Sequence, residues 1–162
     1  TQARDLARLL RDDPFDAIYS SDLVRALETA RAIAAMHDSL VVNIEPRLRE
    51  INQGQWEGVQ VDTIRERYAS LWKVRRIDPV NIRPPGGETV IEVQERVQSA
   101  LDDIASLHPG GSVLIVSHGL ALATVLCSVR GVPIGLAYQQ IPENAEPIWI
   151  RWPALQAPAN RG

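Results

Sequence analysis

The clearest hydrophobic pattern in the chain is Val113 to Val116, four successive apolar and mostly β-branched residues. Such a run predicts a strand buried on both faces, as in a parallel sheet with helices on each side. Ser117, His118 and Gly119 follow at once, and an apolar helical pattern begins at Leu120. We therefore expect His118 at the carboxyl edge of a sheet, beside a helix start whose N–H groups favour an anion. A histidine tucked under a loop is the alternative.

Strands and helices alternate along the rest of the chain. Short apolar runs predict strands at 17–20, 41–44 and 148–152, and helical spacing predicts helices at 3–10, 23–34, 64–72, 88–107 and 120–129. Ser20, Ser21 or Asp22 is expected to cap the second helix. This alternation predicts one α/β domain over residues 1–153, a three-layer sandwich with a mostly parallel central sheet. Residues 154–162 are predicted to be a disordered tail.

Composition excludes several classes of partner. The net charge of −3 argues against a nucleic-acid-binding protein, whose binding surface would be basic. No apolar run reaches membrane-spanning length, and the chain does not open with a signal-peptide pattern. Cys127 lies in an apolar helical stretch and is predicted to be a small core residue. We therefore expect a cytoplasmic protein with no nucleic-acid or membrane partner.

Three polar clusters follow predicted strands or occupy a long loop: residues 20–25, 47–58 and 117–119. Loops at the carboxyl edge of an open α/β sheet converge on one crevice, which would bring Arg25, Glu50 and His118 together. A cation in the first turn of a helix opposes the helix dipole, so Arg25 needs an anionic neighbour. The simpler alternatives are surface ion pairs, of Arg25 with Asp22 or Glu28 and of Glu50 with Arg47 or Arg49.

Several of these segments together resemble one known family. Residues 20–30 (SSDLVRALETA) are similar to the SS-x-L-x-R-A-x-x-T-A block of the histidine phosphatase superfamily, in its phosphoglycerate mutase-like branch. Four other segments resemble further motifs of the family in the same order along the chain. Residues 2–10 resemble its G-x-x-Q-A-x-x-L helix, residues 48–58 resemble L-x-E…G-x-W-E-G, residues 85–89 resemble P-G-G-E-S/T, and residues 117–119 resemble its second histidine motif. The resemblance covers nearly the whole chain and implies a phosphoglycerate mutase-like fold.

The resemblance implies a two-step phosphoryl transfer through a phosphohistidine, with no cofactor and no metal. It makes Arg25, Ser21, His118 and Gly119 phosphate-binding residues, Glu50 the proton donor to the leaving alkoxide, and His118 a catalytic residue as well. Preplaced cationic donors such as Arg25 and His118 would stabilise the charge on the equatorial oxygens of the phosphoryl group. A general acid such as Glu50 contributes roughly 10²–10⁴-fold to the release of a poor leaving group.

The chain departs from the family at its nucleophile. The R-H-G motif is absent, and neither His37 nor His108 matches it; both are expected to be surface residues. The motif belongs to the family's first strand, which we expect to precede Thr1 in a longer parent protein. The 162-residue chain is therefore predicted to lack turnover by itself.

The expected partner is phosphate or a small phosphorylated metabolite, and a homodimer is possible. The helix after Gly119 begins with residues 120–123 (LALA), where members of the family often carry a glycine and an arginine, and the region from Glu57 to Pro85 is short. Both features favour a phosphatase over a phosphoglycerate mutase-like phosphotransferase. A non-catalytic phosphate-binding or interaction module is a second hypothesis. A serine hydrolase using Ser117 or Ser21 is disfavoured, because no G-x-S-x-G elbow occurs. The rings of Trp56, Tyr68, Trp72 and Tyr138 either pack together or line a substrate pocket.

Overall fold

Three parallel strands form the sheet of this protein. The computed structural model describes residues 2–153, so the predicted tail at 154–162 lies outside the described residues. The sheet order is β2-β1-β3, with β1 spanning Ala17–Ser20, β2 Val42–Ile44 and β3 Val113–Val116. Both pairings are parallel, and Ser20 is aligned with Ile44 on one side and with Val116 on the other. All three strands therefore end at the same edge, as the sequence predicts.

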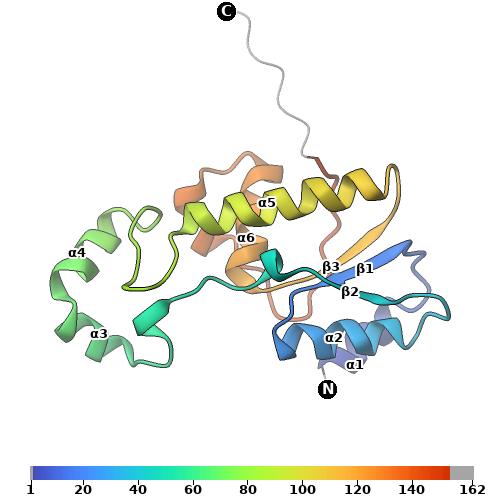
Figure 1. Cartoon of the computed structure of the whole chain (residues 1–162), viewed down its shortest axis with the longest axis horizontal. Coiled ribbons are helices and arrows are strands. Elements are labelled where there is room, and N and C mark those ends of the chain that lie inside the picture. Colours follow the sequence, from blue (N-terminus) through green and yellow to red (C-terminus); the bar gives the residue numbers. More distant parts are fainter. Residues whose placement is uncertain (1, 154–162) are drawn as a thin grey trace, which may run out of the picture.

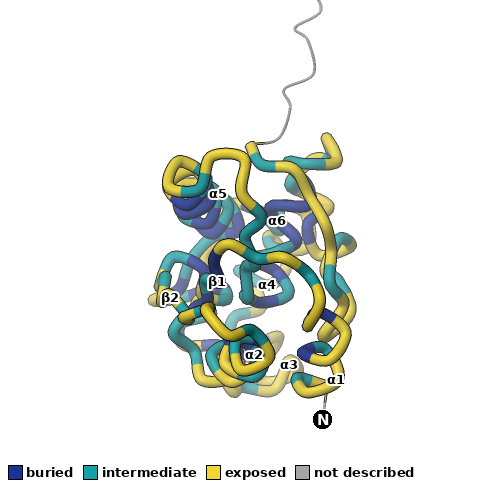
Figure 2. Tube along the Cα trace, turned by 90° about the vertical axis from the view of Figure 1, so that its right-hand side faces the viewer, coloured by how far each residue is buried: buried dark blue, intermediate teal, exposed yellow. Residues whose placement is uncertain are grey.

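Helices cover both faces of this sheet and make the three-layer sandwich that the sequence predicts (Figure 1). On one face, α1 (Gln2–Leu9) and α2 (Val24–Ala34) pack with Ile18 and Leu114. On the other face, α5 (Val90–Leu107) and α6 (Gly119–Arg130) pack with Tyr19 and Ile115. The alternation of neighbouring strand residues between two cores follows from the two-residue period of a strand. Along α5, buried and exposed positions alternate as on an amphipathic helix (Figure 2).

A small helical lobe projects from one end of the sandwich (Figure 1). It consists of α3 (Val61–Arg67) and α4 (Ala69–Ile77), where the sequence predicts one helix over 64–72. The break falls at Tyr68, whose φ of −123° and ψ of 39° are not helical. Its hydroxyl donates to Gln55 Oε1 at 2.9 Å and its ring packs against Trp56, so Tyr68 is held by the preceding loop rather than by a continuous helix.

Two expectations about the sheet are wrong. Residues 148–152 form no strand: Trp149 stacks on Phe15 at 5.9 Å, and Trp152 Nε1 donates to Asp102 on α5. Side-chain anchors therefore hold this segment in place of a ladder. All four residues of β3 are half-buried, not fully buried, because β3 ends the sheet and pairs only with β1 among residues 2–153.

Short turns and 3₁₀ segments complete the described chain. The loop after β2 contains η1 (Pro46–Leu48) and η2 (Gly54–Trp56), and η3 (Ile134–Gln139) follows α6. Gly131 ends α6 in the left-handed conformation that suits a helix C-terminus. Cys127 is buried in α6, as the sequence predicts. No helix within residues 2–153 has the length and apolar composition to cross a membrane.

The loop from residue 46 to 58 and the P-G-G-E turn are in direct backbone contact. Gln55 N donates to Pro85 O at 2.9 Å, and Glu88 N donates to Asn52 O at 2.8 Å. A Cβ at Gly54 would lie 2.2 Å from Pro85 O, and a Cβ at Gly87 would lie 2.5 Å from Asn52 O. Glycine at both positions therefore allows two loops that are distant in sequence to touch.

Gly54→Ala should destabilise the protein more than Gly58→Ala. Both glycines have positive φ, +54° and +70°, but a Cβ at Gly58 meets nothing within 4 Å. Left-handed strain alone costs about 1–2 kcal/mol, and forced contact adds about 1–3 kcal/mol. Urea unfolding followed by tryptophan fluorescence should give a loss of about 1 kcal/mol for Gly58→Ala and about 3 kcal/mol for Gly54→Ala. Equal losses would contradict the contact argument.

Candidate active site

His118 lies where the carboxyl end of β3 meets the start of α6. It is the N-cap residue of α6, with extended backbone (φ −132°, ψ 164°), and only 6% of its surface is exposed. The β1–β3 pairing places Ser20 beside Val116, so the segment after β1 lies next to the segment after β3. Ser21 N donates to Val116 O at 3.1 Å and fixes this arrangement.

Both ring nitrogens of His118 have partners from the loop and helix after β1. Ser21 Oγ lies 2.6 Å from Nε2, and Arg25 Nε donates to Nδ1 at 3.0 Å. Because a guanidinium N–H can only donate, Nδ1 carries no proton and the ring proton resides on Nε2. His118 is therefore a neutral imidazole that donates its Nε2–H to the Ser21 hydroxyl.

The electrostatics of His118 differ from the sequence expectation of a preplaced cation. Burial, together with the positive charge of Arg25, lowers the pKa of His118 to about 4, while Glu50 opposes this shift. The imidazole is thus neutral near pH 7. Arg25, on the first turn of α2 as expected, supplies the positive charge at this position.

Ser21 contributes to the site and does not cap α2. The N-cap residue of α2 is Leu23, and it makes no side-chain cap hydrogen bond, so the predicted cap at Ser20, Ser21 or Asp22 is wrong. Ser21 is fully buried, and its hydroxyl faces His118 while also accepting from Leu23 N at 3.3 Å. The turn after β1 thus brings the hydroxyl to the histidine at the expense of the helix cap.

Glu50 reaches the same helix start from the loop after β2. Its carboxylate accepts from the backbone N–H groups of Leu120 and Ala121, each at 3.2 Å, and from its own neighbour Ile51 at 2.9 Å. The sequence predicts free N–H groups at the start of α6 for a ligand anion. In the structure a carboxylate of the chain already takes two of these groups, an arrangement that the helix dipole favours.

Gly119 gives this carboxylate room. A Cβ built at Gly119 would lie 3.8 Å from Glu50 Oε2 and 3.0 Å from a methyl group of Ile141. Any larger residue would therefore press on Ile141 beside the carboxylate. Arg25, Ser21, Glu50, His118 and Gly119, predicted from three separate segments, all lie at the carboxyl edge of the sheet.

The simple ion pairs considered for Arg25 and Glu50 do not form within residues 2–153. Asp22 pairs with Arg49, which donates to it through Nε at 2.6 Å and through Nη2. This hydrogen bonding lowers the pKa of Asp22 below its usual value. Arg47 pairs with Glu45 and Asp103. The pair of Asp22 and Arg49 joins the loops that follow β1 and β2.

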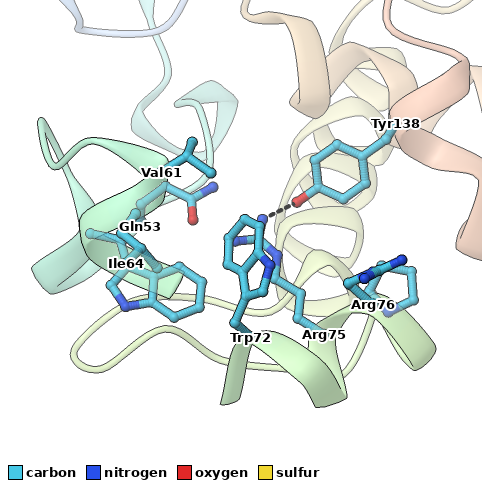
Figure 3. Close-up of a pocket in the computed structure, with 9 residues that line it drawn as sticks. Gln53, Val61, Ile64, Trp72, Arg75, Arg76 and Tyr138 are labelled. Carbon is cyan, nitrogen blue, oxygen red and sulfur yellow. Dashed lines mark hydrogen bonds between the residues drawn. The ribbon is translucent and has the colours of Figure 1, made fainter. Parts of the chain in front are cut away.

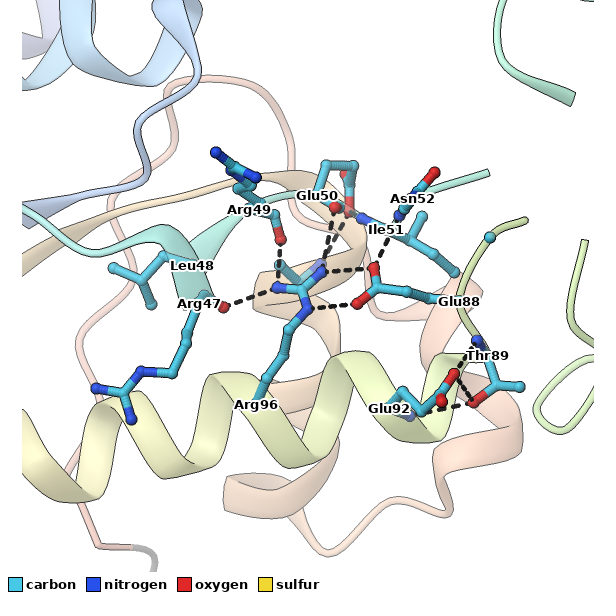
Figure 4. A network of polar contacts seen from close by, with 12 residues as sticks. Arg47, Leu48, Arg49, Glu50, Ile51, Asn52, Glu88, Thr89, Glu92 and Arg96 are labelled. Carbon is cyan, nitrogen blue, oxygen red and sulfur yellow. Dashed lines mark hydrogen bonds and ion pairs between the residues drawn. The ribbon is translucent and has the colours of Figure 1, made fainter. Parts of the chain in front are cut away.

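A residue not singled out in the sequence, Arg96 of α5, holds the Glu50 loop in position (Figure 4). Its guanidinium donates to three backbone carbonyls, those of Arg47, Arg49 and Glu50, at 2.7, 2.8 and 3.1 Å. It also binds both oxygens of Glu88, at 2.8 and 3.0 Å. The only feature of the sequence that could have indicated this role is the position of Arg96 beside Val93 and Val97, at the border of the apolar face of α5.

The two other histidines lie away from this site. His108 Nε2 lies 3.0 Å from the hydroxyl of Tyr19, and His37 packs against Phe15 with ring centroids 5.6 Å apart. Both are half-buried, not the surface residues expected. Within the described part of the chain, no three His, Cys, Asp or Glu side chains are grouped as metal ligands would be.

A three-layer α/β fold (Figure 1) with arginine, histidine and glutamate side chains at the carboxyl edge of its sheet matches the site layout that the motifs of the sequence indicate. The histidine phosphatase superfamily (branch 1) matches residues 1–156. The chain therefore belongs to this superfamily, as its motifs indicate.

Relatives with assigned names include both phosphatases and mutases. The chain is 32% identical over 144 residues to phosphoserine phosphatase 1 of Hydrogenobacter thermophilus, covering 89% of this chain and 68% of the relative. It is 36% identical over 133 residues to a probable phosphoglycerate mutase of Erwinia tasmaniensis, covering 82% of this chain and 61% of that protein. The chain thus spans less than two thirds of the length of the mutase relative.

Solved structures agree with this assignment. The α-ribazole phosphatase of Shigella flexneri superposes with a TM-score of 0.76 at 28% identity, over 85% of this chain and 68% of that one. A mycobacterial glucosyl-3-phosphoglycerate phosphatase in complex with inorganic phosphate gives a TM-score of 0.73 at 28% identity, over 84% of this chain and 69% of that one. Phosphate is therefore a ligand of at least one structural relative.

Stability should fall as the pH is lowered from 6.5 towards 4, because His118 must be neutral in the folded protein. Its folded pKa of about 4 lies below the unfolded value of 6.5, so the unfolded chain binds the extra proton in this window. Chemical denaturation at several pH values should show a loss of about 2–3 kcal/mol between pH 6.5 and 4.5. His118→Asn, which does not titrate, should have a flatter profile, and a parallel profile would contradict the assignment.

Proposed function

We propose that this chain provides the phosphate-binding and proton-donating groups of a phosphomonoester hydrolase that works through a phosphohistidine intermediate. The observation that carries the proposal is the contact of Arg25 with His118, beside a helix start that holds the Glu50 carboxylate. These groups come from three loops at one sheet edge, and the family includes phosphatases with phosphate-bound structures. The ligand is then phosphate or a small phosphorylated metabolite.

Arg25, Ser21 and His118 are assigned to the phosphoryl oxygens. The guanidinium of Arg25 offers two parallel N–H donors, which match two oxygens of a tetrahedral dianion. The Nε2–H of His118 points at Ser21 Oγ, and a phosphate oxygen takes the place of that hydroxyl as acceptor. A neutral imidazole can perform this role because it needs only its N–H. The Ser21 hydroxyl then becomes a donor to the same phosphoryl group, and Gly119 keeps the helix start close to it.

Glu50 is assigned as the general acid. Attack on phosphorus by a histidine forms an N–P bond and breaks the P–O bond of the ester, and the departing alkoxide takes the proton from the Glu50 carboxylic acid. Water then attacks the phosphorus of the phosphohistidine, Glu50 takes the proton of that water, and the N–P bond breaks to release phosphate and the free histidine.

The attacking histidine has to come from outside this chain. The sequence has three histidines, and the two other than His118 are held by Tyr19 and Phe15. A histidine at the end of an added strand beside β3 would reach this sheet edge. We therefore assign residues 1–153 to a single domain that is completed by such a first strand.

Two other functions use the same residues. A phosphoglycerate mutase-like transferase would return the phosphoryl group to a second hydroxyl, and one relative carries that name. The short, separate α3–α4 lobe favours hydrolysis, since water then has access to the intermediate. A phosphate-binding module without turnover is the other candidate, and the lack of a second histidine at the site within residues 2–153 favours it.

Inorganic phosphate should bind this chain, and Arg25→Gln should weaken binding about 10–100-fold, because a hydrogen bond to a charged group contributes about 1.5–3 kcal/mol. Isothermal titration at pH 7 with phosphate, and with vanadate as a second oxyanion, measures this.

The matched control is Arg31→Gln, which removes an exposed arginine from the same helix and should leave phosphate affinity unchanged. Failure of the unaltered chain to bind either oxyanion would refute the proposal. Equal affinities of Arg25→Gln and the unaltered chain would remove Arg25 from the site.

The chain alone should form no covalent phosphoenzyme. With 4-nitrophenyl phosphate as the substrate, intact-mass measurement after an alkaline quench, in which a phosphohistidine is stable, should detect no phosphoryl adduct, because no described residue supplies the nucleophile. A stable adduct on any of the three histidines would contradict this prediction.

A further inference from the structure

A surface pocket of about 440 Å³ lies where the α3–α4 lobe meets η3 and the loop after Glu50 (Figure 3). Three aromatic side chains line it, Trp56, Trp72 and Tyr138, together with the arginines Arg75 and Arg76. In Figure 3, Tyr138 reaches the pocket from one side, and Trp72 and Arg75 of α4 reach it from another. The pocket therefore combines flat apolar surfaces with positive charge.

Arg75 is held in place by the aromatic rings. Its guanidinium carbon lies 5.2 Å from the ring centre of Trp56, 5.9 Å from that of Trp72 and 5.8 Å from that of Tyr138. Its Nη2 donates to the Tyr138 hydroxyl at 2.8 Å. Cation–π contacts and one hydrogen bond thus orient Arg75 and leave its remaining N–H groups available.

The positive charge in this pocket is not neutralised. Neither Arg75 nor Arg76 forms an ion pair with a carboxylate within residues 2–153, whereas Arg65 of the same lobe pairs with Asp62. The pocket thus holds two cations without a carboxylate partner among the described residues, and both favour an anionic, acceptor-rich ligand.

The pocket lies within reach of the candidate active site. Gln53 also lines it and follows Glu50 by three residues. Three residues of extended chain span at most about 11 Å. A molecule whose ester oxygen lies at Glu50 can therefore extend into the pocket if its leaving group is about as long as an aromatic ring with one substituent.

We propose that this pocket binds the leaving group of the substrate, and that this group is an aromatic ring carrying an acidic substituent. The proposal rests on the function proposed above. Trp72 and Tyr138 contact the ring, and Arg75 pairs with the acidic substituent. Small sugar or three-carbon leaving groups would leave the aromatic surfaces uncovered.

Binding of four compounds to the intact chain tests this inference: inorganic phosphate, ethyl phosphate, phenyl phosphate and 4-carboxyphenyl phosphate. Phenyl phosphate should bind about tenfold more tightly than ethyl phosphate, because ring contacts contribute about 0.5–1.5 kcal/mol beyond buried area. The carboxylate should add about another tenfold through its charge-assisted bond with Arg75. Isothermal titration at constant ionic strength gives all four affinities.

Variants separate the two contributions. Arg75→Met should abolish the advantage of the carboxylate and keep that of the ring, and Trp72→Ala should weaken both aromatic esters. Phosphate affinity should be unchanged in both variants, which also shows that they fold. Arg67→Met, which removes an exposed arginine of α3 outside the pocket, is the matched control and should leave every affinity unchanged.

The outcomes distinguish this inference from the proposed function. If phosphate itself does not bind, the proposed function fails. If phosphate binds and all three esters bind equally well, only the inference about the leaving group fails. If benzoate binds in the pocket without competing with 4-carboxyphenyl phosphate, the pocket is separate from the substrate site and the inference is wrong.

Discussion

The arrangement of the candidate site depends on one guanidinium group. Arg96 of α5 donates to three backbone carbonyl groups in the loop that carries Glu50, and its guanidinium is held by the carboxylate of Glu88. A loop without regular structure cannot satisfy these carbonyls internally, so a cation from the neighbouring helix does so. With its backbone held, Glu50 reaches the N–H groups of Leu120 and Ala121. The position of α6, and with it that of His118, is thus linked to a side chain on another helix.

The polar groups of the candidate site are partnered by one another. Glu50 takes the place of an anion at the start of α6, and the Ser21 hydroxyl takes the place of an acceptor for His118. Arg25 donates to a neutral ring in place of a carboxylate. A phosphoryl oxygen is an acceptor that the same N–H donors can bind. Binding can therefore exchange internal contacts for ligand contacts and leave few buried groups unpaired.

Much of the fold follows from local sequence patterns. The apolar run Val113 to Val116 predicts β3, and the helical spacing of apolar residues predicts α5 and α6. These predictions are possible because burial and periodicity can be read from neighbouring residues in the sequence. The segment 148–152 has the same apolar character and forms no strand, because contacts of Trp149 with Phe15 and of Trp152 with Asp102 hold it outside the ladder. Tyr68 likewise ends a helix through contacts with Gln55 and Trp56, which helical spacing does not encode.

The candidate site was partly predictable for the same reason. Motifs identified Arg25, Glu50 and His118, and the parallel strand ends account for their meeting. Their protonation and partners were not predictable: His118 is neutral because of its burial and Arg25, and Glu50 binds backbone N–H groups of a helix seventy residues away. The role of Arg96 was not predictable, because it binds backbone carbonyl groups, which every residue has and which therefore give no sequence pattern.

The end position of β3 has a consequence for the behaviour of this polypeptide in solution. Within residues 2–153, β3 has a strand neighbour on one side only, and its four residues are apolar. An apolar end strand without charged or proline residues is a template for a strand from another molecule. Preparations of this polypeptide should consequently require low concentration or a solubilising fusion to prevent intermolecular β-sheet growth.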